Sequence, residues 1–175
     1  MTLESYDVRR ALESVLACYS TAVDATHSRI EATCNTIRTE RGVTSYLPDH
    51  SSAAPITCEL RSDYLTELLL PALCASAGSV VEEPWMSYQL DLQLPVRVAL
   101  VHPTYRSPAE SDLLGWEYAR ALSWCLRQYG VQGAQDVRLW HVRVDREALD
   151  ITARLQGRQV AVIDATVRYR TTGGH

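Results

Sequence analysis

The clearest pattern in the sequence is an alternation of apolar and polar residues between Tyr88 and Val101. Leucine and valine occupy every second position, and polar residues such as Gln89, Asp91 and Arg97 stand between them. A period of two over this length predicts a long β-strand with one buried face. Pro95 has no N–H to donate to a neighbouring strand, so we expect this strand to have an edge position or a β-bulge near its middle.

A similar alternation near the C-terminus predicts a hairpin over residues 149–170. Its expected strands are Leu149–Leu155 and Val160–Tyr169. The apolar phase slips by one residue at Val162 and Ile163, where we expect a β-bulge. A further strand is predicted for Val137–Val144, although its alternation is interrupted.

The first forty residues repeat apolar side chains at steps of three and four, which predicts helical structure. This stretch is either one long helix or two helices separated near Asp24–His27. Arg41–Gly42 is the expected stop, because glycine adopts the left-handed conformation that closes a helix. Residues 43–55 contain two prolines and no periodicity, so we expect a loop there.

Two further helices and a short strand are expected in the remaining segments. Ile56–Leu60 favours a strand, and Asp63 is the expected cap of a helix that runs to about Leu73. Ser107 begins a stronger signal, with proline at the first helical position and glutamate at the third, as in a capping box. That helix should end at Gly130.

This order of elements predicts one α+β domain over residues 1–170, followed by a flexible tail over 171–175. Sequential strands with short turns favour an antiparallel sheet that contains the long strand 88–101 and the hairpin 149–170, with helices packed on one face. The length of 175 residues and the hydrophobic fraction of 46% suit a single domain with a substantial core.

Composition narrows the possible partners. All 17 basic residues are arginine, and the formal net charge is −4, without the basic stripe of a dedicated nucleic-acid binder. The N-terminus lacks a signal-peptide pattern, and no apolar run is long enough to span a bilayer, so we expect no membrane partner. The five cysteines are widely spaced and lack any C-x-x-C pair, which favours reduced, packed thiols over a zinc site.

Catalytic motifs are absent from the sequence. It contains no G-x-S-x-G, P-loop, G-x-G-x-x-G or H-E-x-x-H pattern. His102 and His141 with a nearby aspartate are one conceivable metal site, but isolated histidines on strands are more commonly satisfied by their neighbours. The adjacent residues Asp49–Ser52 do not make a catalytic triad, because triads assemble from separate segments. We expect no catalytic residues, no cofactor and no metal.

Large aromatic residues instead point to protein contacts. Trp116 falls off the inward stripe of its helix, and Trp124 does so in part, while two arginines share the same flank. Tryptophan and arginine are enriched at protein interfaces. The loop 43–55 and the segment 82–85 are further expected contacts. The residues predicted to lie in subunit interfaces are Trp85, Trp116, Arg120, Arg127, Tyr46, Glu82 and Glu83.

From Tyr88 to Arg170 the chain resembles the tail terminator proteins of long-tailed bacteriophages. The resemblance rests on the strand beginning Tyr88-Gln89-Leu90-Asp91-Leu92, the acid-bearing helix beginning Ser107-Pro108-Ala109-Glu110-Ser111-Asp112, and the final hairpin ending near Tyr169. It implies a homo-hexameric ring that caps the tail tube and joins it to the neck and head connector. DNA would pass through the lumen without specific binding. The protein would act in the virion, at the tail–neck junction, after assembly in the host cytoplasm.

Other readings remain open on the sequence. The N-terminal eighty residues, with an extra helix and the loop 43–55, exceed the family pattern and could instead suit another neck or connector protein. An α+β module that encloses a small molecule is a second alternative, and an enzyme that uses His102 or His141 is a third. The oligomeric state separates these readings from a ring-forming subunit.

Overall fold

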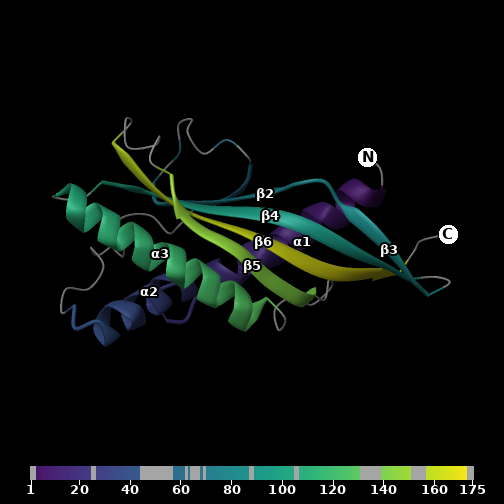
Figure 1. The fold of residues 1–175 in the computed structure, drawn as a ribbon, viewed down its shortest axis with the longest axis horizontal. Coiled ribbons are helices and arrows are strands. Elements are labelled where there is room, and N and C mark those ends of the chain that lie inside the picture. Colours follow the sequence, from purple (N-terminus) through teal and green to yellow (C-terminus); the bar gives the residue numbers. More distant parts are fainter. Residues whose placement is uncertain are drawn as a thin grey trace.

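The computed structural model of the chain describes residues 3–24, 27–43, 57–61, 63, 68, 70–86, 89–104, 107–130, 139–150 and 157–172. The described elements are α1 (Leu3–Ser20), α2 (Arg29–Glu40), β1 (Thr57–Leu60), β2 (Ala72–Ala77), β3 (Val81–Met86), β4 (Gln89–Pro103), α3 (Pro108–Tyr129), β5 (Leu139–Leu149) and β6 (Arg158–Thr172). Figure 1 shows their arrangement. The predicted α+β class is confirmed.

The six strands form one sheet in the order β1-β2-β4-β6-β5, with β3 beside β4. All pairs are antiparallel except β1 and β2, which run parallel. The predicted long strand is β4, and it lies in the centre of the sheet. It pairs with β6 over its whole length, from Gln89 opposite Thr172 to Pro103 opposite Arg158.

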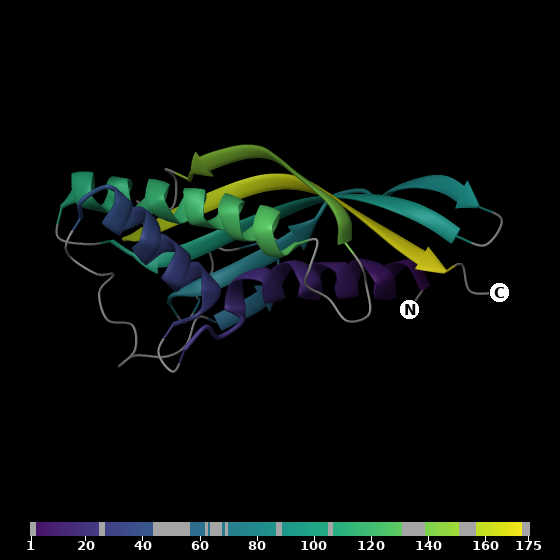
Figure 2. The same cartoon turned by 90° about the horizontal axis from the view of Figure 1, so that it is seen from below.

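The helices pack on one face of this sheet, as the sequence predicts. Alternate residues of β4 and β6 point to that face, and they share one buried cluster with apolar residues of α1, α2 and α3. Figure 2 views the molecule from the helix side, with the helices in front of the sheet. The strand residues of this cluster include Leu73, Leu94, Val96, Val98, Leu100, Ile163, Val167 and Tyr169.

The expected edge position or bulge at Pro95 is wrong. Pro95 lies in the central strand β4, opposite Thr166 of β6. On its other side, β2 pairs with β4 only from Val96 onward and β3 only up to Gln93. Gly78, between β2 and β3, donates its N–H to the Pro95 carbonyl at 2.8 Å. The proline therefore lies where the neighbouring strand is interrupted, so its missing N–H breaks no ladder.

The expected bulge at Val162 and Ile163 is also wrong. The pairing of β6 with β4 continues through these residues without a shift. Ile163 faces the helices, whereas Val160 and Val162 belong to a second buried cluster on the opposite face, against Leu68 and Leu70. Both faces of the sheet are buried there, which produces consecutive apolar residues. The register shifts occur instead in β5, between Leu139 and His141 and between Val144 and Arg146.

Three segment boundaries differ from the sequence-based expectation. The strand paired with β6 is Leu139–Leu149, which extends the expected strand Val137–Val144 to Leu149, and residues 151–155 of the expected strand Leu149–Leu155 lie outside the described residues. The predicted flexible tail begins too early, because Thr171 and Thr172 still pair with β4. The expected helix from Asp63 to Leu73 is wrong at its end, since Leu73 is a buried residue of strand β2.

The helix signals are confirmed in their local detail. The first forty residues form two helices, and Gly42 has a φ of 74° just after α2. Ser107 accepts a hydrogen bond from the backbone N–H of Glu110 and so caps α3. Gly130 ends α3 with a φ of −59°, which is not a left-handed conformation. Glycine is needed here because a Cβ atom would lie only 2.8 Å from a Val142 methyl carbon.

Four of the five cysteine thiols are buried, and Cys58 is exposed. Burial raises the pKa of Cys18 to about 12 and the pKa of Cys125 to about 11. Burial also raises the pKa of Cys34. The described cysteines are all free thiols, so the expectation of packed, reduced thiols holds for every one except Cys58.

We expect the free energy of unfolding to fall as the pH rises above about 8.5, where unfolded thiols begin to ionise. The buried thiols of the folded protein ionise only at higher pH, so unfolding releases protons in this range. The buried thiols therefore contribute their full stabilisation below this range and lose it as the pH rises. Urea titrations between neutral pH and about pH 9.5 measure this slope. In native protein at neutral pH, a thiol reagent should modify only Cys58 rapidly. A flat stability profile, or rapid modification of all five thiols, contradicts the prediction.

Candidate subunit interface

After its first turn, α3 faces solvent mainly along one narrow line, and most of its other residues are packed into the domain. This line contains large apolar side chains: Leu113 is 46% exposed, and Trp116 and Trp124 are each 48% exposed. Arg120 and Arg127 are exposed between and beyond them. Spacings of three and four residues place all five on one side of the helix. We call these five residues the α3 stripe; its aromatic and arginine content is typical of a protein interface.

Helix α2 is held against α3 by a buried ion pair. Arg38 donates from Nη1 to Oε2 of Glu117 at 2.5 Å, and these side chains are 13% and 0% exposed. The Thr33 hydroxyl lies 3.3 Å from the Cys125 sulfur, which makes a second polar contact between the helices. Because both contacts join α2 to buried positions of α3, they fix one side of the exposed stripe.

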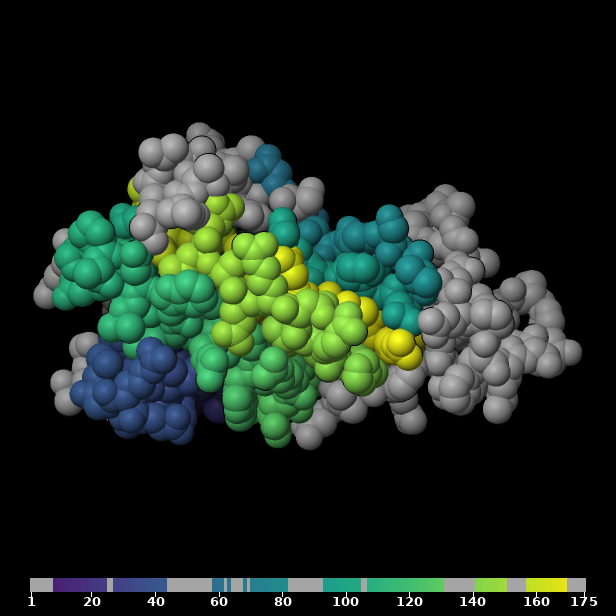
Figure 3. Space-filling view, viewed as in Figure 1, coloured from purple at the N-terminus to yellow at the C-terminus, as the bar shows by residue number. Residues whose placement is uncertain are grey.

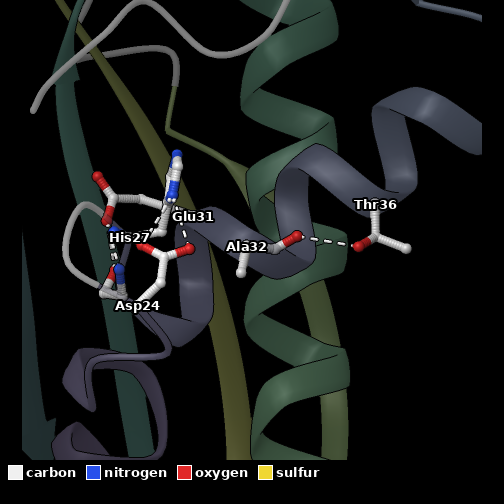
Figure 4. Close-up of polar contacts among 6 residues, drawn as sticks. Asp24, His27, Glu31, Ala32 and Thr36 are labelled. Atoms are coloured by element: carbon white, nitrogen blue, oxygen red, sulfur yellow. Dashed lines mark hydrogen bonds and ion pairs between the residues drawn. The ribbon is translucent and has the colours of Figure 1, made fainter.

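The beginning of α2 is fixed by a local network, shown in Figure 4. The Glu31 carboxylate accepts hydrogen bonds from the Ser28 backbone N–H at 2.8 Å and from the Ser28 hydroxyl at 2.7 Å. In the preceding turn, Asp24 accepts from the His27 backbone N–H at 2.7 Å. These bonds satisfy donors at the helix start and set the position of Arg29, the first residue of α2.

A hollow of about 670 Å³ lies over the C-terminal half of α3. In Figure 3, α3 is visible between α2 and β5. We call this hollow the α3 trough. It is lined by Val23, Arg29, Ala32, Thr33, Thr36, Ile37, Glu40, Arg41, Arg120, Ser123, Trp124, Arg127, Tyr129 and Glu147. Three residues of the α3 stripe, Arg120, Trp124 and Arg127, therefore line the trough together with residues of α2.

Aromatic rings and a buried hydroxyl line the trough. The Arg29 guanidinium carbon is 4.2 Å from the centroid of the Tyr129 ring, a cation–π contact. The ring centroids of Trp124 and Tyr129 are 5.8 Å apart in an edge-to-face arrangement. Ser123 is only 2% exposed, and its hydroxyl has no hydrogen-bond partner among the described residues.

The trough is positively charged in an acidic protein. Arg29, Arg41, Arg120 and Arg127 against Glu40 and Glu147 leave a net charge of +2, whereas the whole chain carries −4. Arg120 is 69% exposed and only 3.9 Å from a Glu147 carboxylate oxygen. An exposed pair at that distance holds the arginine weakly, so its guanidinium remains accessible to a partner.

The structure brings together three of the predicted interface residues and separates the others. Trp116, Arg120 and Arg127 share the α3 stripe. Residues 82, 83 and 85 belong to β3, which Figure 1 places far from α2 along the longest axis. Tyr46 lies outside the described residues, as does the Asp49–Ser52 segment.

Sequence reasoning missed the α2 side of the trough. Arg29 and Arg41, at the two ends of α2, were not predicted to lie in an interface, and neither were Ser123 and Tyr129 on the facing side of α3. One signal was present at Arg29. A cation in the first turn of a helix is unfavourable with respect to the helix dipole, so its presence there indicates another contact.

The conceivable metal site at His102 and His141 is not formed. His102 is buried, 5.1 Å from the Tyr118 ring, and is paired with Gln159 of β6. His141 is exposed and paired with Arg168. These two partners lie nine positions apart on β6, about 30 Å along a strand. Within the described ranges, no group of three or more His, Cys, Asp or Glu residues could hold a metal ion.

A second hollow, of about 800 Å³, lies between α1 and β1. Apolar residues of α1 such as Leu12 and Leu16 line it, and Arg9 and Glu13 at its rim pair with each other at 2.9 Å. None of its lining residues holds a buried side-chain polar atom without a hydrogen-bond partner in the described part of the chain. A ligand site combines an apolar pocket with convergent polar groups, so this hollow is the weaker candidate.

No protein-family model matches the chain, and no curated protein gives a significant match. Among the described helices, none is long and apolar enough to cross a membrane.

Proposed function

We propose that this protein is the subunit of a closed ring that caps the tail tube of a long-tailed bacteriophage and joins it to the neck. The observation that carries the proposal is the exposure of Leu113, Trp116 and Trp124 on a helix that otherwise belongs to the core. Solvent-facing positions of such a helix are ordinarily polar. A line of exposed aromatic and apolar side chains is typical of a surface that another protein covers.

The proposed mechanism is the arrest of a growing polymer. A tube end exposes strand edges and apolar surface that recruit the next tube subunit. A ring that covers this end and presents a different outer surface stops growth, because no complementary surface remains. Heterologous contacts that close around an axis build such a ring from identical chains. The acidic balance of the chain lets DNA pass through the lumen without being retained.

The oligomeric state of the purified full chain tests the proposal. Mass photometry at micromolar concentration and negative-stain images should show closed rings, with six copies expected from the family resemblance. Added to polymerising tail-tube protein, the rings should bind tube ends and shorten the tubes. A monomer at every concentration that leaves tube length unchanged would falsify the proposal. A monomer that retains a small anion in the α3 trough would instead favour the ligand-binding alternative.

A further inference from the structure

The exposed side of α3 is acidic at one end and basic at the other. Glu110, in the first turn, and Arg127, in the last turn, are both exposed. Oxygen Oε2 of Glu110 accepts a hydrogen bond from the Ser107 hydroxyl at 3.2 Å, and the carboxylate keeps lone pairs for a second donor. The Arg127 guanidinium has no hydrogen bond or ion pair with another described residue. About 26 Å of helix separates these two charges, so they cannot pair within one copy.

These end charges and the α3 stripe are arranged symmetrically about the middle of the helix. Glu110 and Arg127 lie at equal distances from the midpoint between residues 118 and 119, and so do Leu113 and Trp124. The other two large residues of the stripe, a tryptophan and an arginine, match within one position. A surface with this symmetry is complementary to a copy of itself turned by a half rotation.

We infer that two copies of this chain pair through this side of α3, with the two helices antiparallel about a two-fold axis. The carboxylate of Glu110 then meets the Arg127 guanidinium of the second copy in a charge-assisted contact. Leu113 lies against Trp124 of the second copy. Every contact is made twice, and the exposed apolar residues of both copies are covered together. Figure 3 shows α3 at the surface of the molecule, where a second copy can reach it.

The direction of the two helices follows from the charges. In a parallel pair, Glu110 would face Glu110 and Arg127 would face Arg127, and like charges opposite each other disfavour association. Near the two-fold axis of the antiparallel pair, the two Arg120 side chains approach each other. Each lies 3.9 Å from a Glu147 carboxylate oxygen of its own copy, which offsets their repulsion. Each can also stack on Trp116 of the second copy, since arginine packs well on aromatic rings.

This pairing goes beyond the proposed ring and describes the free subunit. An isologous contact uses the same surface of both copies, so it closes at two copies and does not extend. Because the ring contact also needs the α3 stripe, a paired subunit must separate before it enters the ring. The dimer therefore keeps the exposed apolar residues covered until assembly begins.

Exchange of the two end charges tests the pairing. Below the concentration at which rings form, mass photometry of the native protein should show dimers. Glu110→Arg and Arg127→Glu should each raise the dimer dissociation constant at least about 10-fold, because two pairs of like charges then face each other. The double variant E110R/R127E should dimerise again, since opposite charges meet once more. The matched exchange R9E/E13R, in an exposed ion pair on α1, should leave the dimer unchanged.

A cross-linking experiment tests the same geometry without changing Glu110, which also contributes to the cap of α3. In a Cys58→Ser background, which removes the exposed native thiol, Leu113→Cys and Trp124→Cys are oxidised separately and as a mixture. A disulfide dimer should form in the mixture, because these positions face each other across the axis. Neither variant alone should form one, because its two introduced thiols lie about 16 Å apart along the antiparallel helices.

The possible results separate this pairing from the ring. If each cysteine variant cross-links alone as readily as in the mixture, or if E110R/R127E is folded but stays monomeric, the inference is wrong and the proposed ring still stands. Native rings with no dimer at any lower concentration also overturn the inference. Dimers that never assemble into rings contradict the proposed function and leave this pairing intact. Circular dichroism and thermal melts show whether each variant is folded.

Discussion

Replacing Glu117 with alanine should lower the free energy of unfolding by about 3–5 kcal/mol, the cost of breaking a buried ion pair from one side. Glu117 is fully buried, and its carboxylate forms an ion pair with Arg38, whose side chain is 13% exposed. The substitution leaves the Arg38 guanidinium in a mostly buried position without its carboxylate. It also opens a space between α2 and α3. Urea denaturation followed by circular dichroism measures the loss.

Two further variants make the test specific, namely the substitution of Arg38 alone and the double substitution of Arg38 and Glu117. Arg38→Ala should destabilise the protein to a similar extent, because it leaves the Glu117 carboxylate buried without its cation. The double variant should lose less than the sum of the two single changes, since neither charge is then left alone. Glu13→Ala is the matched control. Its carboxylate is 52% exposed and paired with Arg9, so it should change stability by less than about 1 kcal/mol.

A small loss in Glu117→Ala, equal to that of Glu13→Ala, contradicts the prediction. Such a result means that α2 docks on α3 through its apolar residues alone, with Ile30 and Cys34 as the buried contacts. The position of α2 also matters for the candidate interface, because α2 forms one wall of the α3 trough. A variant that loosens α2 should therefore weaken assembly as well as stability.

The sequence was most informative where one period governs a whole element. Alternation predicted β4, and the capping residues predicted α3 almost to the residue. The sequence pattern was misleading where tertiary contacts bury both faces of a strand. The adjacent apolar residues Val162 and Ile163 in β6 looked like a bulge, although the pairing is regular and both faces of the sheet are covered there. The leucine-rich stretch before Pro71 looked helical, yet the chain enters strand β2 at Ala72.

The candidate interface could likewise be predicted only in part from the sequence. The outward position of Trp116 and Arg120 follows from helical spacing alone, and the structure confirms their exposure. The trough does not follow from spacing, since it forms only when α2 packs on α3 through Arg38 and Glu117. These two residues are far apart in the sequence, and nothing local to either one indicates the other.

Truncating Trp116 to alanine should break the ring while leaving the fold intact. A tryptophan at the centre of a protein interface contributes at least about 2 kcal/mol on truncation, which raises the dissociation constant of each contact about 30-fold. In the isolated chain Trp116 is 48% exposed, so much of its side chain makes no core contact, and the loss of stability should stay below about 1 kcal/mol.

Mass photometry of the native protein and of Trp116→Ala at equal concentration measures the effect. Leu113→Ser/Trp116→Ala should be monomeric wherever the native protein forms rings. Leu60→Ser is the control: Leu60 is a large apolar residue, 37% exposed, and it lies on β1, away from α3. Rings that survive in the double variant would show that the α3 stripe faces solvent in the assembly. If Leu60→Ser loses rings to the same extent, assembly is sensitive to the loss of any exposed apolar side chain. That result would contradict a specific role of α3 in the ring contact.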